Sequence, residues 1–404
     1  MNGTYCVHAE RSLNVGISGD TKICCMSKKL FTKNGKIIRS TKDSIKDAWN
    51  SQDRIEIVEA LKSGVKHANC DLCWREENAG IASKRIRDNA RYNLEPLKDQ
   101  PVIMDLNMGN ICNLKCRTCG SHSSSKWLQE EMDVYNKKPA ATQVLQCLPD
   151  NFQDNESWSV LQSWSNNLKF IDFYGGEPML LKKHWHLLEK SVADGSSQHQ
   201  VLHYNTNGTI FPEDKLDLFR KFKGFDLSLS LDGVDKSFEY IRHPASWKAV
   251  KENCLRWKKF TESLDIEIKE LSICLTISLI NIFDLDKIYT ELKELNINIY
   301  FNLVHEPKHF NISNMPNNFK ETVVKKLEES ISSSESHPMS VILNFMKQGV
   351  PQDKEWTMFI TTIKKHDRYR KESFADVFPE YYRLIESSFL QVVLEPVFGD
   401  KEIA

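Results

Sequence analysis

The chain carries three closely spaced cysteines in the stretch Cys112-Asn113-Leu114-Lys115-Cys116-Arg117-Thr118-Cys119, with the pattern C-x3-C-x2-C. With 11 cysteines among 404 residues, chance gives this spacing about 0.008 times. The stretch follows an apolar run at 102–106 that predicts a β-strand. Three thiolates on one short loop suit a cubane iron–sulfur cluster, whose irons normally take one cysteine each. Because only three are offered, one iron keeps an open position, which is typical of a reactive metal site.

A second motif ends the next predicted strand, at 168–173. The stretch Tyr174-Gly175-Gly176-Glu177-Pro178 follows it directly. Two glycines let the backbone come close to a ligand, and a proline then stiffens the turn. Glu177 adds a carboxylate at the C-terminal end of a strand, where α/β folds place their ligands. By itself the motif would more often be a tight turn than a site.

Together, the three-cysteine loop and this glycine motif resemble the radical S-adenosylmethionine (SAM) superfamily. The resemblance implies that Cys112, Cys116 and Cys119 hold a [4Fe–4S] cluster and that SAM chelates the fourth iron. It also implies that the backbone of Gly175 to Pro178 holds the amino group of SAM.

Two later segments extend the resemblance in the same order along the chain. Thr206-Asn207-Gly208 follows a third predicted strand, and Asn207 is implied to contact the cofactor. Ser230-Leu231-Asp232-Gly233 follows a fourth and, with Arg242, is similar to the segment that contacts the ribose and carboxylate of SAM in the sulfatase-maturating and peptide-maturating branch. Thr118 departs from the family, which often has an aromatic residue before the third cysteine, so the contacts to adenine stay open.

Five further cysteines lie near the N-terminus, and their spacing indicates a second metal site. The segment 13–23 predicts a hairpin with its turn near Gly19-Asp20. A helix predicted at 44–63 leads to a C-x2-C clip. One cysteine pair from the hairpin and one from the clip can close a four-ligand site, for which zinc and an iron–sulfur cluster are both physically acceptable. The five are Cys6, Cys24, Cys25, Cys70 and Cys73.

This N-terminal region resembles the SPASM/twitch modules of radical SAM enzymes, which carry auxiliary [4Fe–4S] clusters. The match includes Gly19-x4-Cys24 and the segment Trp49-Asn50-Ser51, although such modules usually follow the barrel and here the module precedes it. The implied ligands are Cys6, Cys24, Cys70 and Cys73, with Cys25 as the alternative to Cys24. Four cysteines would fill all four irons, which favours an electron-transfer role.

Composition agrees with a cytoplasmic protein. The hydrophobic content is 40%, and there is no run of 18 apolar residues and no signal-peptide pattern. Clustered cysteines in odd number fit a reducing compartment better than a disulfide framework. The net charge of −1 offers no basic face, so nucleic acid is not an expected partner. Cys147, Cys254 and Cys274 stand in apolar surroundings and are expected to be core thiols.

The organisation predicted is α/β: a partial (β/α)6 TIM-type barrel with a small N-terminal iron–sulfur module and a C-terminal helical extension. Alternation of strands and helices implies parallel strands with crossovers, and six units are too few for a closed eightfold barrel. The predicted domains are 1–90, 101–310 and 311–404, with a linker near 90–100. Predicted strands are 102–106, 168–173, 201–205, 226–230, 271–277 and 299–304, and predicted helices include 123–135, 180–192, 212–222, 246–262 and 283–295.

The resemblance implies reductive cleavage of SAM to a 5′-deoxyadenosyl radical, which takes a hydrogen atom from a substrate. The electron would come from an external reductant such as flavodoxin or ferredoxin. The second cluster favours an oxidative modification, and the resemblance to peptide-modifying enzymes favours a peptide or protein substrate. A small metabolite, sugar or nucleotide is the alternative substrate class, and a non-catalytic metal-binding scaffold is the alternative function.

Two polar residues follow the sixth predicted strand. His305 and Glu306 would stand at the C-terminal ends of the strands, where barrels place their active sites. They are therefore candidates for substrate contact or proton exchange. A solvent-facing loop explains them equally well.

Overall fold

The computed structural model describes residues 3–78, 80–92, 99–135, 156–330 and 338–394. These residues form two compact units, the first made of residues 1–276 and 291–302 and the second of 277–290 and 303–404. Within the predicted features, linker residues 93–98 and Cys147 lie outside the described residues. The three predicted domains, as functional parts, stay a prediction.

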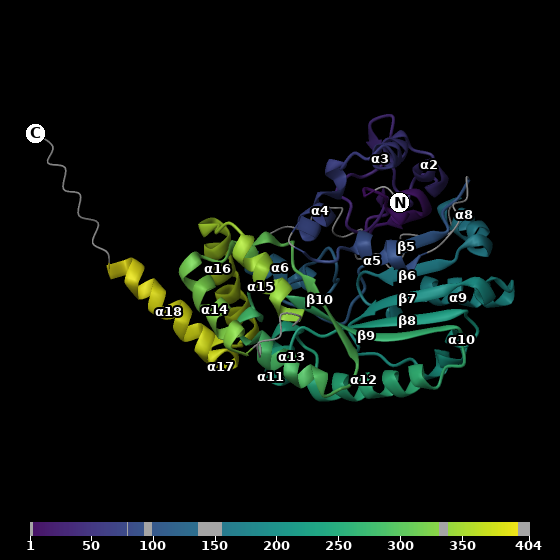
Figure 1. The fold of residues 1–404 in the computed structure, drawn as a ribbon. Coiled ribbons are helices and arrows are strands. Elements are labelled where there is room, and N and C mark those ends of the chain that lie inside the picture. Colours follow the sequence, from purple (N-terminus) through teal and green to yellow (C-terminus); the bar gives the residue numbers. More distant parts are fainter. Residues whose placement is uncertain (1–2, 79, 93–98, 136–155, 331–337, 395–404) are drawn as a thin grey trace, which may run out of the picture. The chain divides into compact units, whose positions relative to one another are not determined.

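The first unit is built on an eight-stranded sheet with the order β10-β9-β8-β7-β6-β5-β1-β2 (Figure 1). Neighbouring strands from β5 to β9 are parallel, and β10 lies beside β9. All six predicted barrel strands are present, so the partial (β/α)6 barrel is confirmed. The barrel strands are β5 (Ile103–Asn107), β6 (Phe170–Tyr174), β7 (Val201–Thr206), β8 (Gly224–Ser230), β9 (Ile268–Ile277) and β10 (Asn298–Leu303).

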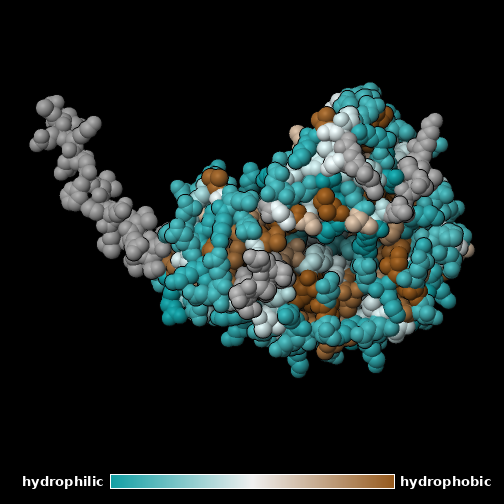
Figure 2. Space-filling model, in the orientation of Figure 1, coloured by the Kyte–Doolittle hydropathy of each residue, from teal (hydrophilic) through white to brown (hydrophobic). Residues whose placement is uncertain are grey.

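Helices cover one face of this sheet, because alternate strand residues on that face are apolar. Phe173 of β6 contacts the ring of His184 in α9 (Lys182–Ala193) at 4.7 Å, and Phe225 of β8 stacks on Trp257 of α12 (Trp247–Glu262) at 5.9 Å. Figure 1 shows α9, α10 and α12 along this side, and Figure 2 shows a mainly hydrophilic surface over α12.

The opposite face of the sheet is polar and faces the inside of the partial barrel. Register places Asp105, Asp172, His203 and Asp226 side by side across β5 to β8. Helix α5 (Lys84–Arg91) lies against this row, since its Arg91 pairs with Asp226 at 2.5 Å. An apolar cluster below the row, which includes Tyr92, closes the N-terminal end of the strands.

The N-terminal segment joins the barrel sheet, which the sequence did not indicate. Strand β1 (Ser12–Val15) pairs in parallel with β5, and β2 (Thr21–Lys22) returns antiparallel to β1. The hairpin predicted at 13–23 is confirmed, and Gly19 takes a φ of +75° in its turn, a conformation that glycine adopts without strain. A small second sheet pairs β3 (Thr32–Lys33) with β4 (Lys36–Ile37).

Helices predicted near the N-terminus differ in detail. The single helix expected at 44–63 is two, α2 (Ile45–Trp49) and α3 (Gln52–Lys62), because the Ser51 side chain accepts a hydrogen bond from the backbone N–H of Arg54 and starts a new helix. The other helices of this region are α1 (Val7–Arg11) and α4 (Asp71–Asn78).

Helices of the barrel are also shorter than predicted in two places. The helix at 123–135 begins only at Trp127 as α6 (Trp127–Tyr135), because residues 120–125 form turns that anchor the cysteine loop. The helix at 212–222 is reduced to a 3-10 turn and α10 (Leu216–Phe219) after Pro212. The remaining helices of this part are α8 (Glu156–Trp164), α11 (Asp235–Ile241) and α13 (Leu285–Lys293).

The second unit is helical, as predicted for the C-terminal extension. Tyr381 is fully buried and stacks on Phe283 at 5.1 Å, which ties the last helix to residues 277–290. No helix in the described ranges combines the length and apolar character needed to cross a membrane. Its helices are α14 (Asn317–Ser330), α15 (Pro338–Gln348), α16 (Asp353–Arg370), α17 (Phe374–Val377) and α18 (Pro379–Leu394).

Candidate functional site

The three-cysteine loop is held by backbone hydrogen bonds from a distant segment. The N–H groups of Lys115 and Arg117 donate to the carbonyls of His243 and Ile241 at 2.6 and 2.8 Å. These two hydrogen bonds hold alternate residues of the loop. They therefore fix the backbone conformation of the loop before any ligand binds.

One buried cation reinforces this anchor. Arg117 is fully buried, its Nε donates to the carbonyl of Tyr240 at 2.9 Å, and its guanidinium lies 3.5 Å above the centre of the Tyr240 ring. Trp127 donates its indole N–H to the carbonyl of Cys116 at 3.0 Å. Sequence reasoning missed Arg117, Trp127 and Tyr240, because no local pattern shows that residues so far apart in the chain meet.

The thiols of the loop, of which Cys112 is buried and Cys116 and Cys119 are half-buried, lie near hydrogen-bond donors. Asn207 Nδ2 lies 3.8 Å from the sulfur of Cys112, and Arg242 Nη1 lies 4.0 Å from that of Cys116. Burial and the neighbouring thiols raise the pKa of Cys119 to about 11, and burial also raises the pKa of Cys112 and Cys116. Thiolates crowded in this way need a multivalent cation to stay ionised together, which is what an iron–sulfur cluster supplies.

The glycine motif packs directly against the chain that enters this loop. A Cβ atom on Gly176 would lie 2.2 Å from the carbonyl oxygen of Ile111, and one on Gly175 would lie 2.2 Å from Asn107 Oδ1. The N–H of Glu177 donates to the same Ile111 carbonyl at 2.7 Å. Gly176 is therefore required by close backbone approach, and Gly175 by its φ of +120° and the nearby Asn107 side chain. The β6 end and the cysteine loop pack directly against each other.

Glu177 turns its carboxylate inward and ties β6 to β7. It is fully buried and accepts hydrogen bonds from Thr206 Oγ1 and from the backbone N–H of Asn207, both at 2.9 Å. Burial raises the pKa of Glu177, and these hydrogen bonds oppose that rise. Because the side chain is engaged in this way, a contact of the motif with SAM would have to use its backbone; that contact stays a prediction.

Asn207 and Arg242 both reach the cysteine loop. Asn207 donates to Asn113 Oδ1 at 2.9 Å as well as facing Cys112. Arg242 pairs with Asp232 at 2.8 Å, and Asp232 accepts from the N–H of Thr276. Ser230 stands partly exposed at the end of β8. The structure thus brings every predicted SAM contact of the first unit to the C-terminal ends of β5 to β8.

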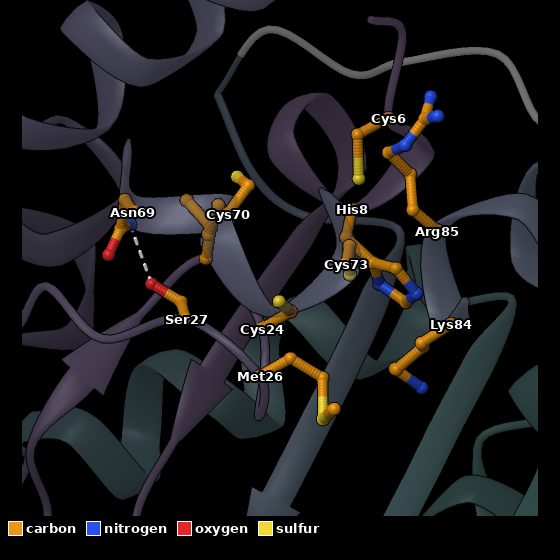
Figure 3. Close-up of a pocket in the computed structure, with 11 residues that line it drawn as sticks. Cys6, His8, Cys24, Met26, Ser27, Asn69, Cys70, Cys73, Lys84 and Arg85 are labelled. Carbon is orange, nitrogen blue, oxygen red and sulfur yellow. Dashed lines mark hydrogen bonds between the residues drawn. The ribbon is translucent and has the colours of Figure 1, made fainter. Parts of the chain in front are cut away.

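Four of the five N-terminal cysteines line one pocket. Figure 3 shows Cys6, Cys24, Cys70 and Cys73 around a shared space, with His8 and Lys84 on its wall. Cys6 precedes α1, Cys24 follows β2, and the clip supplies the other two. Burial, followed by repulsion from neighbouring thiols, raises the pKa of Cys70 to about 12.

Cys25 points elsewhere. Its thiol does not line the pocket, and the charged groups that act on it are Asp105, Lys84, Lys22 and Asp172. Its backbone N–H donates to Asp105 Oδ2 at 3.0 Å. Between the two alternatives that the sequence left open, Cys24 is the one that the fold turns toward the other three thiols.

Asn69 aligns the two halves of this pocket. Its Oδ1 accepts from the N–H of Lys28 at 3.0 Å and its Nδ2 donates to Ser27 Oγ at 2.7 Å, so the loop after Cys24 is clamped to the clip that follows Asn69. The sequence held no signal for this role beyond the position of Asn69 next to Cys70.

The thiols do not converge on a point. Over the described ranges, no three side chains of His, Cys, Asp or Glu are spaced to bind one metal ion together. The ten cysteines in these ranges are all free of disulfide bonds. Cys254 and Cys274 are buried, as core thiols should be.

His305 and Glu306 belong to the second unit. The His305 ring contacts that of Phe345 edge-to-face at 5.9 Å, while Glu306 is exposed. A role for them in substrate contact or proton exchange stays a prediction.

Comparison with known proteins identifies the barrel. Residues 106–268 match the model of the Radical SAM superfamily. Over this segment, which is less than half of the chain, the sequence is similar to the radical SAM domain. No curated protein sequence matches the chain.

Several solved structures are similar over part of their length. One, "Native anSMEcpe with bound AdoMet", is 18% identical with a TM-score of 0.38, and the match covers 55% of this chain and 58% of that one. Another, Streptococcus suis SuiB bound to precursor peptide SuiA, is 11% identical with a TM-score of 0.37, covering 76% and 70%. The chain spans 57–58% of the length of the anSMEcpe structures that it matches. At these values the likeness carries no inference about activity.

Proposed function

From the similarity of residues 106–268 to the radical SAM domain, we propose that this protein reductively cleaves SAM and uses the resulting 5′-deoxyadenosyl radical to oxidise a peptide or protein substrate. One observation carries the proposal: a single compact unit holds two separate groups of buried or half-buried cysteines, three on one loop and four around one pocket. The first group serves the cleavage of SAM, and the second provides an electron acceptor close to the same barrel.

Cys112, Cys116 and Cys119 would hold the SAM-binding [4Fe–4S] cluster, which when bound supplies one electron to the sulfonium of SAM. Crowded thiols on a loop already fixed by residues 240–243 support this assignment, because the ligands then need little reorganisation. Asn207 would steady Cys112, since its amide already faces that sulfur.

The rest of the SAM site would consist of the backbone of the glycine motif together with Ser230 and Arg242. The glycine motif would hold the amino group of SAM, and Ser230 and Arg242 its carboxylate or ribose. Arg242 is held by Asp232 rather than free in solution, so it would meet an anionic ligand with its direction already set.

The N-terminal pocket would hold an auxiliary [4Fe–4S] cluster on Cys6, Cys24, Cys70 and Cys73. Zinc needs four ligand atoms within about 2.3 Å of one ion. The thiols here surround a shared space without converging, which supports the larger cubane. A cluster with all four irons ligated would accept electrons rather than bind substrate, which favours a net oxidation.

The substrate class rests on the Ser-Leu-Asp-Gly segment with Arg242, which is similar to that of peptide-maturating enzymes. A small metabolite, sugar or nucleotide is the alternative for the same chemistry. A metal-binding scaffold without catalysis is the alternative to any chemistry.

The test is anaerobic reconstitution of the full chain with iron and sulfide, followed by reduction with dithionite and an assay for 5′-deoxyadenosine. The wild-type protein is expected to bind roughly eight irons and to cleave SAM. A triple variant, C112A/C116A/C119A, should keep about four irons and cleave none.

Two results would count against the proposal. Iron binding without any SAM cleavage in the parent supports the scaffold. Loss of all iron in the triple variant would show that the N-terminal pocket holds no cluster. For the substrate, a digest of protein from cells grown in deuterated medium should pass deuterium to 5′-deoxyadenosine, whereas transfer only from the small-molecule extract of those cells would favour the metabolite.

A further inference from the structure

An oxidation of the proposed kind must also dispose of a proton. When a radical removes one hydrogen atom from a substrate, the remaining substrate radical reaches a closed-shell product by losing one electron and one proton. A one-electron acceptor takes the first, and a base in the barrel must take the second. The candidate bases are the acidic residues of the row that crosses β5 to β8 on the inward face of the sheet.

Asp226 is unsuited, because one of its carboxylate oxygens, Oδ2, is held by two cationic or hydrogen-bonding partners. It pairs with Arg91 at 2.5 Å and with His203 Nδ1 at 2.7 Å. These partners hold the pKa of Asp226 down at about 2 despite its burial, so it stays ionised when a proton is offered.

Asp105 and Glu270 are also unsuited. Asp105 accepts a hydrogen bond from the N–H of Cys25, and burial raises its pKa, with the neighbouring Asp172 adding to the rise. The Asp105 carboxylate is therefore already occupied as a hydrogen-bond acceptor. Glu270 continues the row on β9, but its side chain is 60% exposed and belongs to the rim.

One carboxylate oxygen of Asp172 accepts no hydrogen bond from the described residues. The residue is only 5% exposed, yet its Oδ1 is buried without a hydrogen-bond partner among the described residues. Its other oxygen lies 3.8 Å from Lys84 Nζ. Asp172 stands two residues before Tyr174 on β6, and the glycine motif follows at once.

The charges around Asp172 come from three neighbouring elements. Helix α5 contributes Lys84 and Asp88, which pair at 3.0 Å, and the adjacent strands contribute Asp105 and His203. Lys84 also lines the four-cysteine pocket. The base and the pocket of the electron acceptor therefore share one buried cation, so the places that would take the proton and the electron are adjacent.

We propose that Asp172 is the proton acceptor of the oxidation. In this step, which rests on the proposed function, the deoxyadenosyl radical takes a hydrogen atom from a substrate carbon. The substrate radical then gives one electron to a one-electron acceptor, of the iron–sulfur class, and one proton to the Asp172 carboxylate. The product lacks two hydrogens, and the Asp172 proton returns to solvent.

The experiment uses the reconstituted full chain, SAM, dithionite and the deuterated protein digest, with D172N beside the wild type. Wild type should put deuterium into 5′-deoxyadenosine and yield peptides that lack two hydrogens, one of them the transferred deuterium. D172N keeps the shape and should transfer deuterium at a rate within about twofold, but its oxidised peptide should fall at least about 100-fold. Its substrate radical should instead take one electron from dithionite and one proton from solvent, so the peptides gain one hydrogen in place of deuterium.

Two further variants separate chemistry from structure. D105N, the neighbour in register, should oxidise peptide as the wild type does, and D172E should restore part of the lost product. Iron content and Tm should match the wild type in all three. Oxidised peptide from D172N within threefold of the wild type would overturn the proposal, as would equal loss of deuterium transfer and product.

Failure of the proposed function gives a different pattern. If the wild type takes deuterium only from the small-molecule extract, the peptide substrate is wrong. The rates of deuterium transfer and of product oxidation by D172N are then compared on that extract. If the wild type takes deuterium from neither pool, the proposed function and the role of Asp172 both fail.

Discussion

At the scale of single residues, the site depends on backbone approach more than on side chains. Gly176 lets the β6 end touch the chain that enters the cysteine loop, where a Cβ atom would meet the Ile111 carbonyl at 2.2 Å. A backbone oxygen cannot move aside as a flexible side chain does. The glycine is therefore needed to keep the cluster loop and the proposed SAM-binding backbone together.

We expect G176A to weaken SAM binding at least about tenfold and to destabilise the fold by about 1–3 kcal/mol, because the Ile111 carbonyl must shift. Equilibrium dialysis with SAM and urea unfolding measure the two effects. G195A is the matched control: Gly195 has a φ of +80° with open space around it, so alanine there should cost about 1 kcal/mol and leave SAM binding unchanged. Equal SAM affinity for G176A and the wild type would contradict the argument.

Adjacent cysteines test the N-terminal pocket. C24S should lose about four irons per chain, since Cys24 lines the pocket with the other three thiols. C25S should keep them, because its thiol faces Asp105 and Lys84 instead. Iron and sulfide analysis after reconstitution gives the answer, and the opposite pattern would mean that Cys25 is the ligand.

At the scale of elements, α5 compensates the charge inside the barrel. A carboxylate in a buried strand is destabilising unless it is paired, and β6 and β8 each carry one on the inward face. Helix α5 supplies a cation to each of these carboxylates: Lys84 lies near Asp172, and Arg91 pairs with Asp226. Lys84 and Arg91 therefore reach carboxylates inside the barrel, while Arg87 of the same helix is exposed.

We expect R91M to cost about 3 kcal/mol at neutral pH, because Asp226 would keep only His203 as a partner. The pKa of Asp226 is about 2 in the fold and about 3.9 in an unfolded chain, so its stabilising contribution is full above about pH 4 and is lost as pH falls toward about 2. The difference in the free energy of unfolding between the wild type and R91M, measured in urea, should therefore shrink over that pH range.

The control is R256M, which removes an exposed pair with Glu213 and should change stability by less than about 1 kcal/mol at any pH. A gap for R91M that stays constant down to about pH 2 would show that Asp226 is not the group involved.

At the scale of the whole molecule, the N-terminal region and the barrel lie in one compact unit. Strand β1 covers the edge of β5 in parallel, and α5 neutralises the barrel interior. Both contributions come from the segment that precedes the barrel in the chain. The barrel without them has an open strand edge and unpaired buried carboxylates, two defects that favour aggregation or unfolding.

A fragment of residues 101–404 is accordingly expected to be insoluble or to unfold without a cooperative transition. Residues 1–92 supplied as a separate chain during expression should restore solubility, because the contacts are non-covalent. Solubility and thermal unfolding measure both. A soluble, cooperatively folded fragment would show that the barrel is independent of α5 and β1.

The strands were predictable because their signal is local. Each barrel strand is a short apolar run that ends in a polar motif, and that pattern alone located all six within a few residues. Helix limits were less accurate, since Ser51 and the turns before Trp127 act through caps and long-range anchors. The β1–β5 pairing left no trace in the sequence, because parallel strands can pair across any separation.

The sequence by itself determined the iron–sulfur chemistry: thiol chemistry and the spacing of Cys112, Cys116 and Cys119 are local, so neither depends on how the chain folds. Only the tertiary structure decided that Cys24 rather than Cys25 joins the other thiols, and that Asp172 alone in the inward row keeps a buried oxygen without a partner among the described residues. Which way a side chain faces, and what it meets there, is set by the packing of α5 and distant strands. That packing depends on contacts between residues far apart in the chain.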